Sequence, residues 1–239
     1  MFFADMHSQK AQTMSLKIYA GETADELTTR LAKDMHLDKA KLLQAYKKYT
    51  RFKEGDIFAQ RYTLARKANE NVVMEYLFHV SSNKLKNFSE QYFSEIPDTF
   101  KLKVLLTIAS IIQRESNAKK EMPLISSVIY NRLDKGMKLQ MDGTLNYGKY
   151  SRQIITSERI KTDTSYYNTY KHKGLPSLPL GTVDFEALKA ARFPAKTDYL
   201  FFMLNPDGSH TFAKTYAEHL ENIRKFRKYQ KNKKCKKVK

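Results

Sequence analysis

The sequence predicts an α+β protein with two structural units. Residues 16–66 show the order strand, helix, helix, strand, which is typical of a small α/β unit. Residues 67–223 combine amphipathic helix patterns with one hairpin pattern, so we expect a mixed helix-and-hairpin domain. Within it, a long irregular segment from about 137 to 181 holds four Gly and two Pro without helical or strand periodicity. A segment of that length is often functional.

The first unit is predicted from its turns and helix caps. The stretch SLKIYAGE (15–22) is typical of a short strand followed by a turn. Thr23 and Glu26 can form a capping box at the start of a first helix, and Asp38 can cap a second. Gly55 then marks a turn into another strand. These signals complete the predicted strand, helix, helix, strand unit.

The second unit begins with three predicted helices. The first covers about 70–94, with a possible break at 81–83. The second, over 99–116, has the strongest helical pattern in the chain. The third starts at Pro123, a residue suited to the first turn of a helix, and stops near Gly136.

A short helix, a hairpin and a last helix complete the domain. Thr182 or Asp184 begins the short helix. The hairpin covers 198–213, with Pro and Gly at the positions that a type I turn prefers. Thr215 and Glu218 form a second capping box before a basic helix.

The chain ends are set apart by their composition. Residues 1–15 are expected to be a flexible N-terminus, and residues 224–239 hold ten Lys or Arg and no acid, out of a net charge of +18. We expect that second segment to be a solvated basic tail, which anionic lipid or polymer could attract. No apolar run of membrane-spanning length and no signal peptide are evident. Cys235, the single cysteine, excludes an intramolecular disulfide.

One carboxylate interrupts an apolar helix face. Ile108, Ile111, Ile112 and Glu115 follow the i, i+3, i+4, i+7 spacing, so they share one side of the helix. Burial of Glu115 at that position would raise its pKa toward neutrality. It would then still hold a proton near pH 7, as a general acid for glycosidic cleavage must. The alternative is an ordinary exposed glutamate at a helix end.

Further candidates lie in the irregular segment and the hairpin. Asp142 could be the second carboxylate that most glycosidases need, or simply part of an Asp-Gly turn. Polar and aromatic side chains around it suit a sugar: Gln140, Thr144, Asn146 and Tyr147. A second patch of this type covers 164–170. His210 either faces the site or is an ordinary hairpin residue. No metal-binding spacing, phosphate-binding loop or serine nucleophile motif is present, so no cofactor is expected.

From about residue 104 to 220 the chain resembles the endolytic murein transglycosylases, the YceG-like family. Four blocks carry the resemblance in order: LTIASIIQRES, ISSVIYNRLDKGMKLQMDGTLNYG, YYNTYKHKGLPSLPLG and GSHTFAKTYAEH. Residues 16–66 resemble the small LysM-like subdomain of that family more weakly. Ser177, Ala59 and Gln60 depart from the family pattern, which has Pro, Pro and an acid at these positions.

The resemblance implies a lyase that cuts the bond between N-acetylmuramic acid and N-acetylglucosamine in peptidoglycan glycan strands. Such a lyase would leave 1,6-anhydro ends and would limit the length of nascent strands. Glu115 would be the single catalytic residue. Substrate-binding roles would fall to a larger set: Gln140, Asp142, Thr144, Tyr147, Tyr167, Asn168, Tyr170 and His210. Asn131 and Arg132 belong to the family pattern, and a helix-capping or ion-pair role fits them equally well.

The resemblance also implies a setting at the periplasmic face of the bacterial inner membrane, with cell-wall synthases as possible partners. The membrane anchor usual in the family is absent from this sequence, which suggests a truncated or soluble version. Three alternatives remain at this point. They are a lysozyme-like hydrolase in which Asp142 positions water, a non-catalytic peptidoglycan-binding scaffold, and a basic nucleic-acid binder. No nucleic-acid motif accompanies the charge, so nucleic acid is not expected as a partner.

Overall fold

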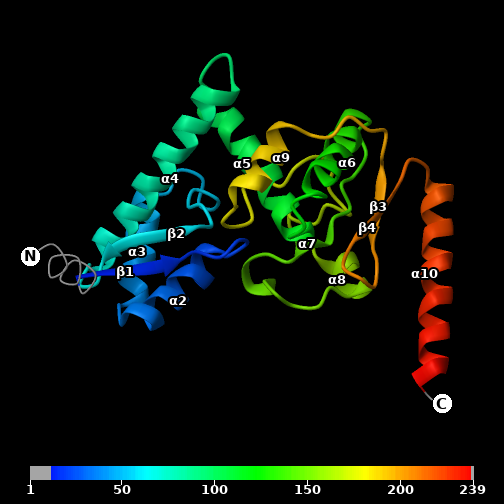
Figure 1. Ribbon diagram of the computed structural model, residues 1–239, viewed down its shortest axis with the longest axis horizontal. Coiled ribbons are helices and arrows are strands. Elements are labelled where there is room, and N and C mark those ends of the chain that lie inside the picture. The colour runs from blue at the N-terminus through cyan, green and yellow to red at the C-terminus, as the bar shows by residue number, and fades with distance from the viewer. Residues whose placement is uncertain (1–11, 238–239) are drawn as a thin grey trace, which may run out of the picture.

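The computed structural model describes residues 12–237, with side chains up to Gln230. Its helices and two small antiparallel sheets confirm the predicted α+β class (Figure 1). The elements in chain order are β1 (Thr13–Lys17), α2 (Ala24–Met35), α3 (Lys39–Tyr49), β2 (Arg61–Ala65), α4 (Glu70–Tyr92), α5 (Thr99–Glu115), α6 (Met122–Asp134), α7 (Asp142–Leu145), η1 (Gly148–Tyr150), α8 (Ser157–Thr162), α9 (Phe185–Arg192), β3 (Phe201–Leu204), β4 (His210–Ala213) and α10 (Tyr216–Lys237).

The N-terminal unit has the predicted order of elements. β1 and β2 pair antiparallel, and α2 and α3 connect them and pack into a shared core. Both bonds of the capping box are present: the Glu26 amide donates to Thr23 Oγ1 over 3.2 Å, and the Thr23 amide donates to Glu26 Oε2 over 2.9 Å. The strand starts at Thr13, so residues 13–15 are paired rather than part of a flexible N-terminus. Residues 1–11 lie outside the described chain.

Helix α4 belongs to both units. Leu77 lies in the core of the N-terminal unit, whereas Phe88 lies in the larger core that α5, α6 and α9 share. The predicted break at 81–83 is wrong, because the helix is continuous from Glu70 to Tyr92. Ser81 is fully buried there, and its hydroxyl accepts a bond of 3.1 Å from the Phe58 amide. Because the Ser81 hydroxyl has a hydrogen-bond partner outside the helix, it does not compete with the helical backbone bonds.

Helix α5 packs against α6, α7 and α9 in the larger unit. Asp98 caps its N-terminus by accepting a bond from the Lys101 amide. Ile108, Ile111 and Ile112 are almost completely buried, which confirms the predicted apolar face. This packing fixes the C-terminal end of the helix, where Glu115 is the last residue.

The irregular segment is less structureless than the sequence suggested, since α7, η1 and α8 interrupt it. Asp184, and not Thr182, caps the helix that follows: its side chain accepts a bond of 2.7 Å from the Ala187 amide. The Thr182 hydroxyl instead donates to the Tyr19 carbonyl in the N-terminal unit over 2.6 Å.

The hairpin forms with the predicted turn. The Gly208 amide donates to the Asn205 carbonyl over 3.1 Å, and the intervening Pro206 takes the position that its fixed φ favours. The second capping box is also present, with Thr215 and Glu218 exchanging bonds of 3.2 and 3.3 Å.

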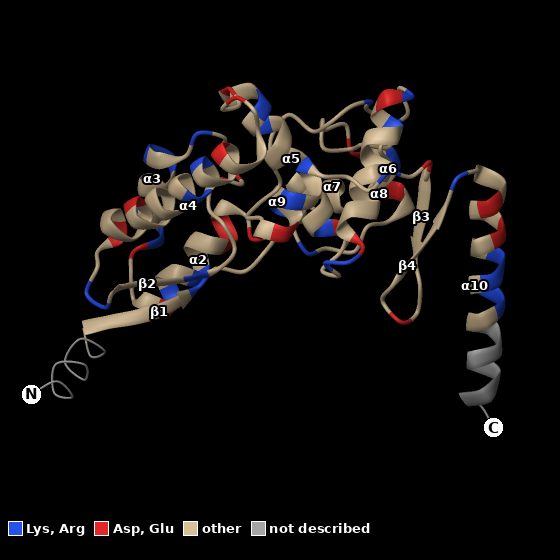
Figure 2. Ribbon diagram, turned by 45° about the horizontal axis from the view of Figure 1, so that its top comes forward, with Lys and Arg blue, Asp and Glu red and all other residues tan. Residues whose placement is uncertain are grey.

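Helix α10 packs only on this hairpin among the elements with substantial contacts, and it stands apart from the rest of the chain (Figure 1). Basic residues follow its two acidic ones along the helix (Figure 2). The basic segment from 224 onward continues α10 as far as Lys237. The last two residues of the predicted tail, and all its side chains after Gln230, lie outside the description. None of the described helices combines the length and apolar character needed to cross a bilayer.

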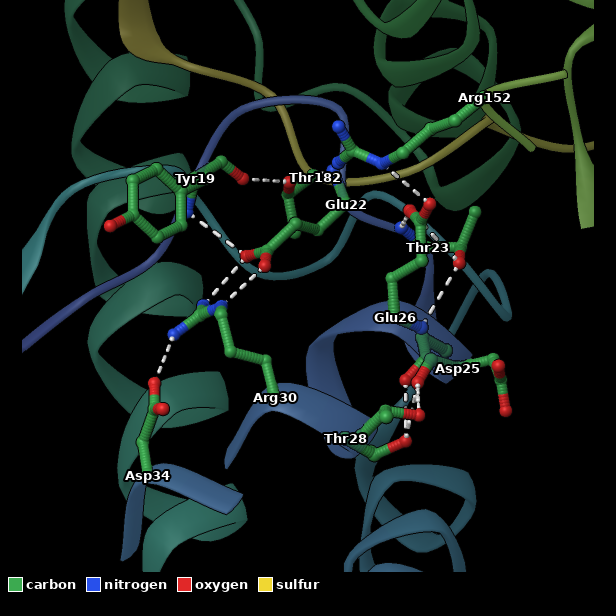
Figure 3. Close-up of polar contacts among 12 residues, drawn as sticks. Tyr19, Glu22, Thr23, Asp25, Glu26, Thr28, Arg30, Asp34, Arg152 and Thr182 are labelled. Carbon is green, nitrogen blue, oxygen red and sulfur yellow. Dashed lines mark hydrogen bonds and ion pairs between the residues drawn. The ribbon is translucent and has the colours of Figure 1, made fainter. Parts of the chain in front are cut away.

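The two units meet at a buried polar contact (Figure 3). Within the N-terminal unit, Arg30 donates to both carboxylate oxygens of Glu22, over 2.5 and 2.8 Å, and so fixes this residue. The backbone of Glu22 exchanges bonds with Thr182, and a Cβ on Gly181 would lie 2.6 Å from the Glu22 carbonyl oxygen. Only glycine permits that approach, so the chain from the larger unit lies directly on the turn that follows β1.

Candidate active site

Glu115 opens onto a cavity of about 320 Å³ at the C-terminal end of α5. The cavity is bounded by α6, by the irregular segment around α7 and by the β3–β4 hairpin, so it gathers parts of the chain that are up to 95 positions apart. The lining residues are Glu115, Arg132, Leu139, Gln140, Asp142, Tyr170, Phe202, Met203, Leu204 and His210.

The environment of Glu115 favours its protonated form. Burial raises its pKa to about 7, and the nearby negative charge of Asp142 acts in the same direction. One bond opposes this shift: the Gly143 amide donates to Glu115 Oε1 over 2.8 Å. Part of the side chain remains open to the cavity. The carboxyl group can therefore carry a proton near neutral pH and present it to a ligand, as its position in the sequence predicted.

Arg114 does not neutralise its neighbour. Its guanidinium points away and donates to backbone carbonyls of Gly21, over 3.2 Å, and Leu180, over 2.8 Å. A third bond reaches the Asn146 carbonyl at the end of α7. The nearest cation in the sequence is thus engaged elsewhere, which leaves the pKa of Glu115 to burial, the Gly143 bond and the charge of Asp142.

Asp142 and Tyr170 form the polar rim on one side of the cavity. The Tyr170 hydroxyl donates to Asp142 Oδ1 over 2.6 Å, while the rest of the carboxylate is exposed. Burial raises the pKa of Tyr170, and the Asp142 bond and charge add to this effect. The Tyr170 hydroxyl therefore stays protonated and remains a donor.

Arg132 is a lining residue whose role the sequence did not reveal. Its guanidinium donates to the carbonyls of Leu200, over 2.6 Å, and Leu139, over 2.7 Å, and to Gln140 Oε1 over 3.3 Å. Asn131 likewise donates across to the backbone before β3. Both residues thus join α6 to neighbouring segments, rather than capping their own helix or forming ion pairs.

Gln140 lies at a constrained point of the chain. Its φ of +50° is in the left-handed region that non-glycine residues rarely adopt. Such local strain persists only where surrounding contacts hold the backbone. Here the Gln140 backbone amide donates to the Thr169 carbonyl over 3.1 Å, and the Arg132 guanidinium donates to the Gln140 side-chain oxygen. The side chain is exposed at the cavity.

His210 is fixed by Glu121. Its Nδ1 lies 2.7 Å from Glu121 Oε2, and its backbone amide donates to Oε1 of the same carboxylate over 2.8 Å. The imidazole belongs to the cavity wall, next to the apolar side chains of Phe202, Met203 and Leu204 from β3. The alternating pattern of a strand does not reveal which other element its side chains will contact. This apolar wall was therefore not predicted from the sequence.

Two predicted binding residues serve the fold instead. Thr144 and Asn168 are completely buried. The Thr144 hydroxyl bonds to the Met141 carbonyl over 2.7 Å, and the Asn168 amide group donates to two carbonyls of the α8 region over 2.8 and 2.9 Å. Neither side chain is available to a ligand, so we assign both to shaping the irregular segment.

Tyr147 and Tyr167 also lie outside the cavity. Their rings contact one another at a centroid distance of 4.4 Å, and the Tyr147 hydroxyl donates to Glu54 Oε1 over 3.2 Å. They therefore face the N-terminal unit rather than Glu115. Of the predicted binding residues, the structure brings Gln140, Asp142, Tyr170 and His210 together with Glu115.

No group of three or more His, Cys, Asp or Glu side chains within the described residues is arranged to hold a metal ion. A protonated carboxyl, a neighbouring carboxylate and several donors around one cavity are suited to acid chemistry on a polar, oxygen-rich ligand.

Comparisons with known proteins show which family the chain is similar to. The model of the YceG-like family matches residues 2–225. A protein of Bacillus subtilis (strain 168) named endolytic murein transglycosylase is 34% identical over 169 residues, which is 70% of this chain and 46% of that relative. The protein of that name from Streptococcus pneumoniae serotype 2 (strain D39 / NCTC 7466) is 30% identical over 176 residues, 71% of this chain and 31% of the relative. The chain thus spans less than half the length of these relatives.

A solved structure shares the fold as well. The crystal structure of a yceG-like protein from Listeria monocytogenes aligns with a TM-score of 0.70 at 28% sequence identity. The alignment covers 87% of this chain and 75% of that chain. The similarity therefore includes most of this chain.

Proposed function

This chain belongs to the YceG-like family, and on that basis we propose that it is an endolytic peptidoglycan lytic transglycosylase with Glu115 as its catalytic residue. The observation that carries the proposal is the position of Glu115, a shielded carboxyl with a pKa of about 7 that faces a cavity with polar groups on one side and an apolar wall on the other. The relatives named for this activity support the substrate class.

The proposed reaction begins with proton transfer. Glu115 donates its proton to the oxygen that joins N-acetylmuramic acid to N-acetylglucosamine, and the bond from that oxygen to C1 breaks. The leaving sugar departs with a free hydroxyl, and C1 acquires oxocarbenium character. The exposed carboxylate of Asp142, in the same cavity, is placed to stabilise this positive charge.

Ring closure completes the reaction. The Glu115 carboxylate takes the proton from the C6 hydroxyl of the muramic acid, and O6 bonds to C1 to form a 1,6-anhydro ring. Because the nucleophile belongs to the same sugar, neither a positioned water nor a protein nucleophile is required. Well-oriented internal attack reaches effective molarities on the order of 10⁵ M or more. Glu115 ends the cycle protonated, as it began.

Product analysis tests this proposal directly. Purified peptidoglycan is digested and the soluble fragments are examined by mass spectrometry. We expect anhydro ends, which are one water lighter than reducing ends. Reducing ends would identify a hydrolase, for which the shared cavity of Glu115 and Asp142 provides a second candidate mechanism. Binding to sacculi without any soluble fragments would identify a scaffold, and either result would overturn the proposed reaction.

The pH dependence follows from the pKa of Glu115. The reaction needs the protonated carboxyl, so kcat/KM should fall as pH rises through about 7. Other groups face this carboxyl from the cavity wall: Asp142, Tyr170, Arg132 and His210. Initial rates of fragment release between pH 5 and 9 provide the measurement. A rate that stays level from pH 6 to 9 would rule out Glu115 as the acid.

We also propose that the chain acts where glycan strands are made, on the cell-wall side of the membrane, together with cell-wall synthases. A role in limiting strand length follows from endolytic cleavage, because each cut shortens the strand that carries it. Comparing strand lengths in cells with and without the active protein tests this role, and lengths that do not change would contradict it.

A further inference from the structure

The segment that supplies Gly143 has little stability of its own. Helix α7 has four residues, too few to form a stable helix in isolation. The residues after it form a short 3-10 turn and irregular chain. Gly143 must nevertheless hold its amide 2.8 Å from Glu115 Oε1. Contacts from outside the segment therefore have to fix it.

Two adjacent residues of α5 hold both ends of α7. Glu115 accepts the bond from Gly143 near its start, and Arg114 donates to the Asn146 carbonyl immediately after its end. The same guanidinium donates to the Gly21 carbonyl, which belongs to the turn between β1 and α2. One half-buried side chain thus links the catalytic helix, α7 and the N-terminal unit.

Two carboxylates of the N-terminal unit hold the rest of the segment. Glu54 accepts a bond of 3.2 Å from the Tyr147 hydroxyl and is itself held by the Ala24 amide at the start of α2, over 2.9 Å. Glu26 accepts two bonds of 2.8 Å, from the Ser151 hydroxyl and from Arg152 Nε, the latter shown in Figure 3. The N-terminal unit therefore holds the second half of the segment 142–152, at Tyr147, Ser151 and Arg152.

The buried state of Glu54 is unusual for a carboxylate. The residue is 5% exposed, and burial raises its pKa to about 7 although the Ala24 and Tyr147 bonds and the Arg114 charge lower it. Burying a carboxylate costs free energy of folding unless hydrogen bonds and nearby charges offset the lost hydration. This environment is consistent with a role in fixing the segment 142–152.

We propose that the N-terminal unit is a positioning element of the active site. Its Glu54 accepts the hydrogen bond from Tyr147 and thereby holds the segment 142–152 in place. The Gly143 amide then remains hydrogen-bonded to Glu115. This inference rests on the proposed role of Glu115. Glu54, Tyr147 and Arg114 are positioning residues, since none of them lines the cavity. The N-terminal unit then contributes to catalysis without touching substrate.

The chain offers a matched control. Asp56 is buried to the same degree as Glu54, at 6% exposed, and burial raises its pKa too. Its hydrogen bonds all lie within its own loop, from Thr50, Arg51 and Phe52. Asp56→Ala therefore removes an equivalent buried carboxylate of the N-terminal unit without touching the segment 142–152.

The test measures hydrogen exchange of the full chain by mass spectrometry. In Glu54→Ala, peptides covering 142–152 should exchange roughly three- to tenfold faster than in the wild type, the factor expected for loss of one hydrogen bond. Glu54→Gln should restore much of the protection, because its amide oxygen can still accept both bonds. Asp56→Ala should leave this segment protected. Tyr147→Phe removes only the hydroxyl and keeps the ring pair, so it tests the link even if Glu54→Ala fails to fold.

Two outcomes would overturn the proposal. One is unchanged exchange over 142–152 in both Glu54→Ala and Tyr147→Phe. The other is an equal increase in Asp56→Ala, which would mean that the whole unit had merely loosened. Exchange does not depend on activity, so failure of the proposed reaction would be recognised separately, from cleavage that persists in Glu115→Gln.

A pH profile adds a readout that general destabilisation would not move. Loss of the Gly143 bond raises the pKa of Glu115, since that bond lowers it. In Tyr147→Phe the high-pH limb of kcat should therefore shift to higher pH, and kcat should fall roughly tenfold or more because the acid is less well placed. The other groups that face Glu115 are unchanged: Asp142, Tyr170, Arg132 and His210. An unshifted limb with normal kcat would count against the proposal.

Discussion

Glu115→Gln is expected to lower kcat on purified peptidoglycan by about 10²- to 10⁴-fold, the contribution usual for general acid–base catalysis. The amide has nearly the same shape and its oxygen can still accept the bond from Gly143, so binding to sacculi should persist. Release of soluble fragments, followed by chromatography and mass spectrometry, measures the loss. Activity within a few-fold of wild type would show that another group supplies the proton.

The same variant should be more stable than the wild type above neutral pH. The pKa of Glu115 rises from 4.5 to about 7 on folding, so the wild type loses stability as pH increases from about 4.5 to 7 and does not regain it above 7. Glutamine has no such loss. The variant should exceed the wild type by on the order of 3 kcal/mol at pH 8 and equal it near pH 4.

Denaturant unfolding at the two pH values checks this expectation. Glu90→Gln is the matched control, since Glu90 is an exposed residue of α4 whose partner is Lys86 on the same helix. It should change neither activity nor the pH dependence of stability. A Glu115→Gln variant less stable than wild type at pH 8 would mean that the carboxylate is not held in an unfavourable environment.

Gly143→Ala is expected to disrupt both the site and the packing around it. A Cβ at this position would lie 2.8 Å from Arg114 Cβ and 2.8 Å from Glu115 Oε1. Relief of that overlap requires α7 to move. This movement breaks the hydrogen bond from the Gly143 backbone amide to Glu115 Oε1. We expect kcat to fall by about 10²-fold and the free energy of unfolding to fall by about 1–3 kcal/mol.

Gly136→Ala separates these effects. Gly136 has a φ of +62° and open space around it, so alanine there strains the backbone without meeting any neighbour. The cost should be about 1–2 kcal/mol, close to that of Gly143→Ala, but activity of the folded protein should remain near wild type. Equal losses of activity in the two variants would mean that stability, and not the position of α7, explains the result.

Much of the fold could be predicted from local signals. Thr23 and Asp38 mark two helix starts, because their side chains bond to amides a few positions away, a contact that sequence spacing reveals. The position of Glu115 could be predicted for a similar reason, because the apolar residues before it define the buried face of one helix.

Other parts of the site depend on contacts between distant segments. Glu115 meets Gly143 across 28 positions and Arg132 meets Leu200 across 68. The prediction that Thr144 and Asn168 bind substrate failed because composition indicates polar character but not which way a side chain points. In this segment their partners are backbone carbonyls of the loop itself.

The sequence alone therefore determined the class of fold, most boundaries of the longer helices and the place of one candidate acid at the end of an apolar helix face, since these follow from residue spacing within single elements. Only the tertiary structure decided which groups surround that carboxyl: the Gly143 amide, the guanidinium of Arg132 and the apolar wall of β3. It also brought Glu54 under the segment 142–152. The physical reason is that packing, and not spacing, sets the distance between residues of different elements.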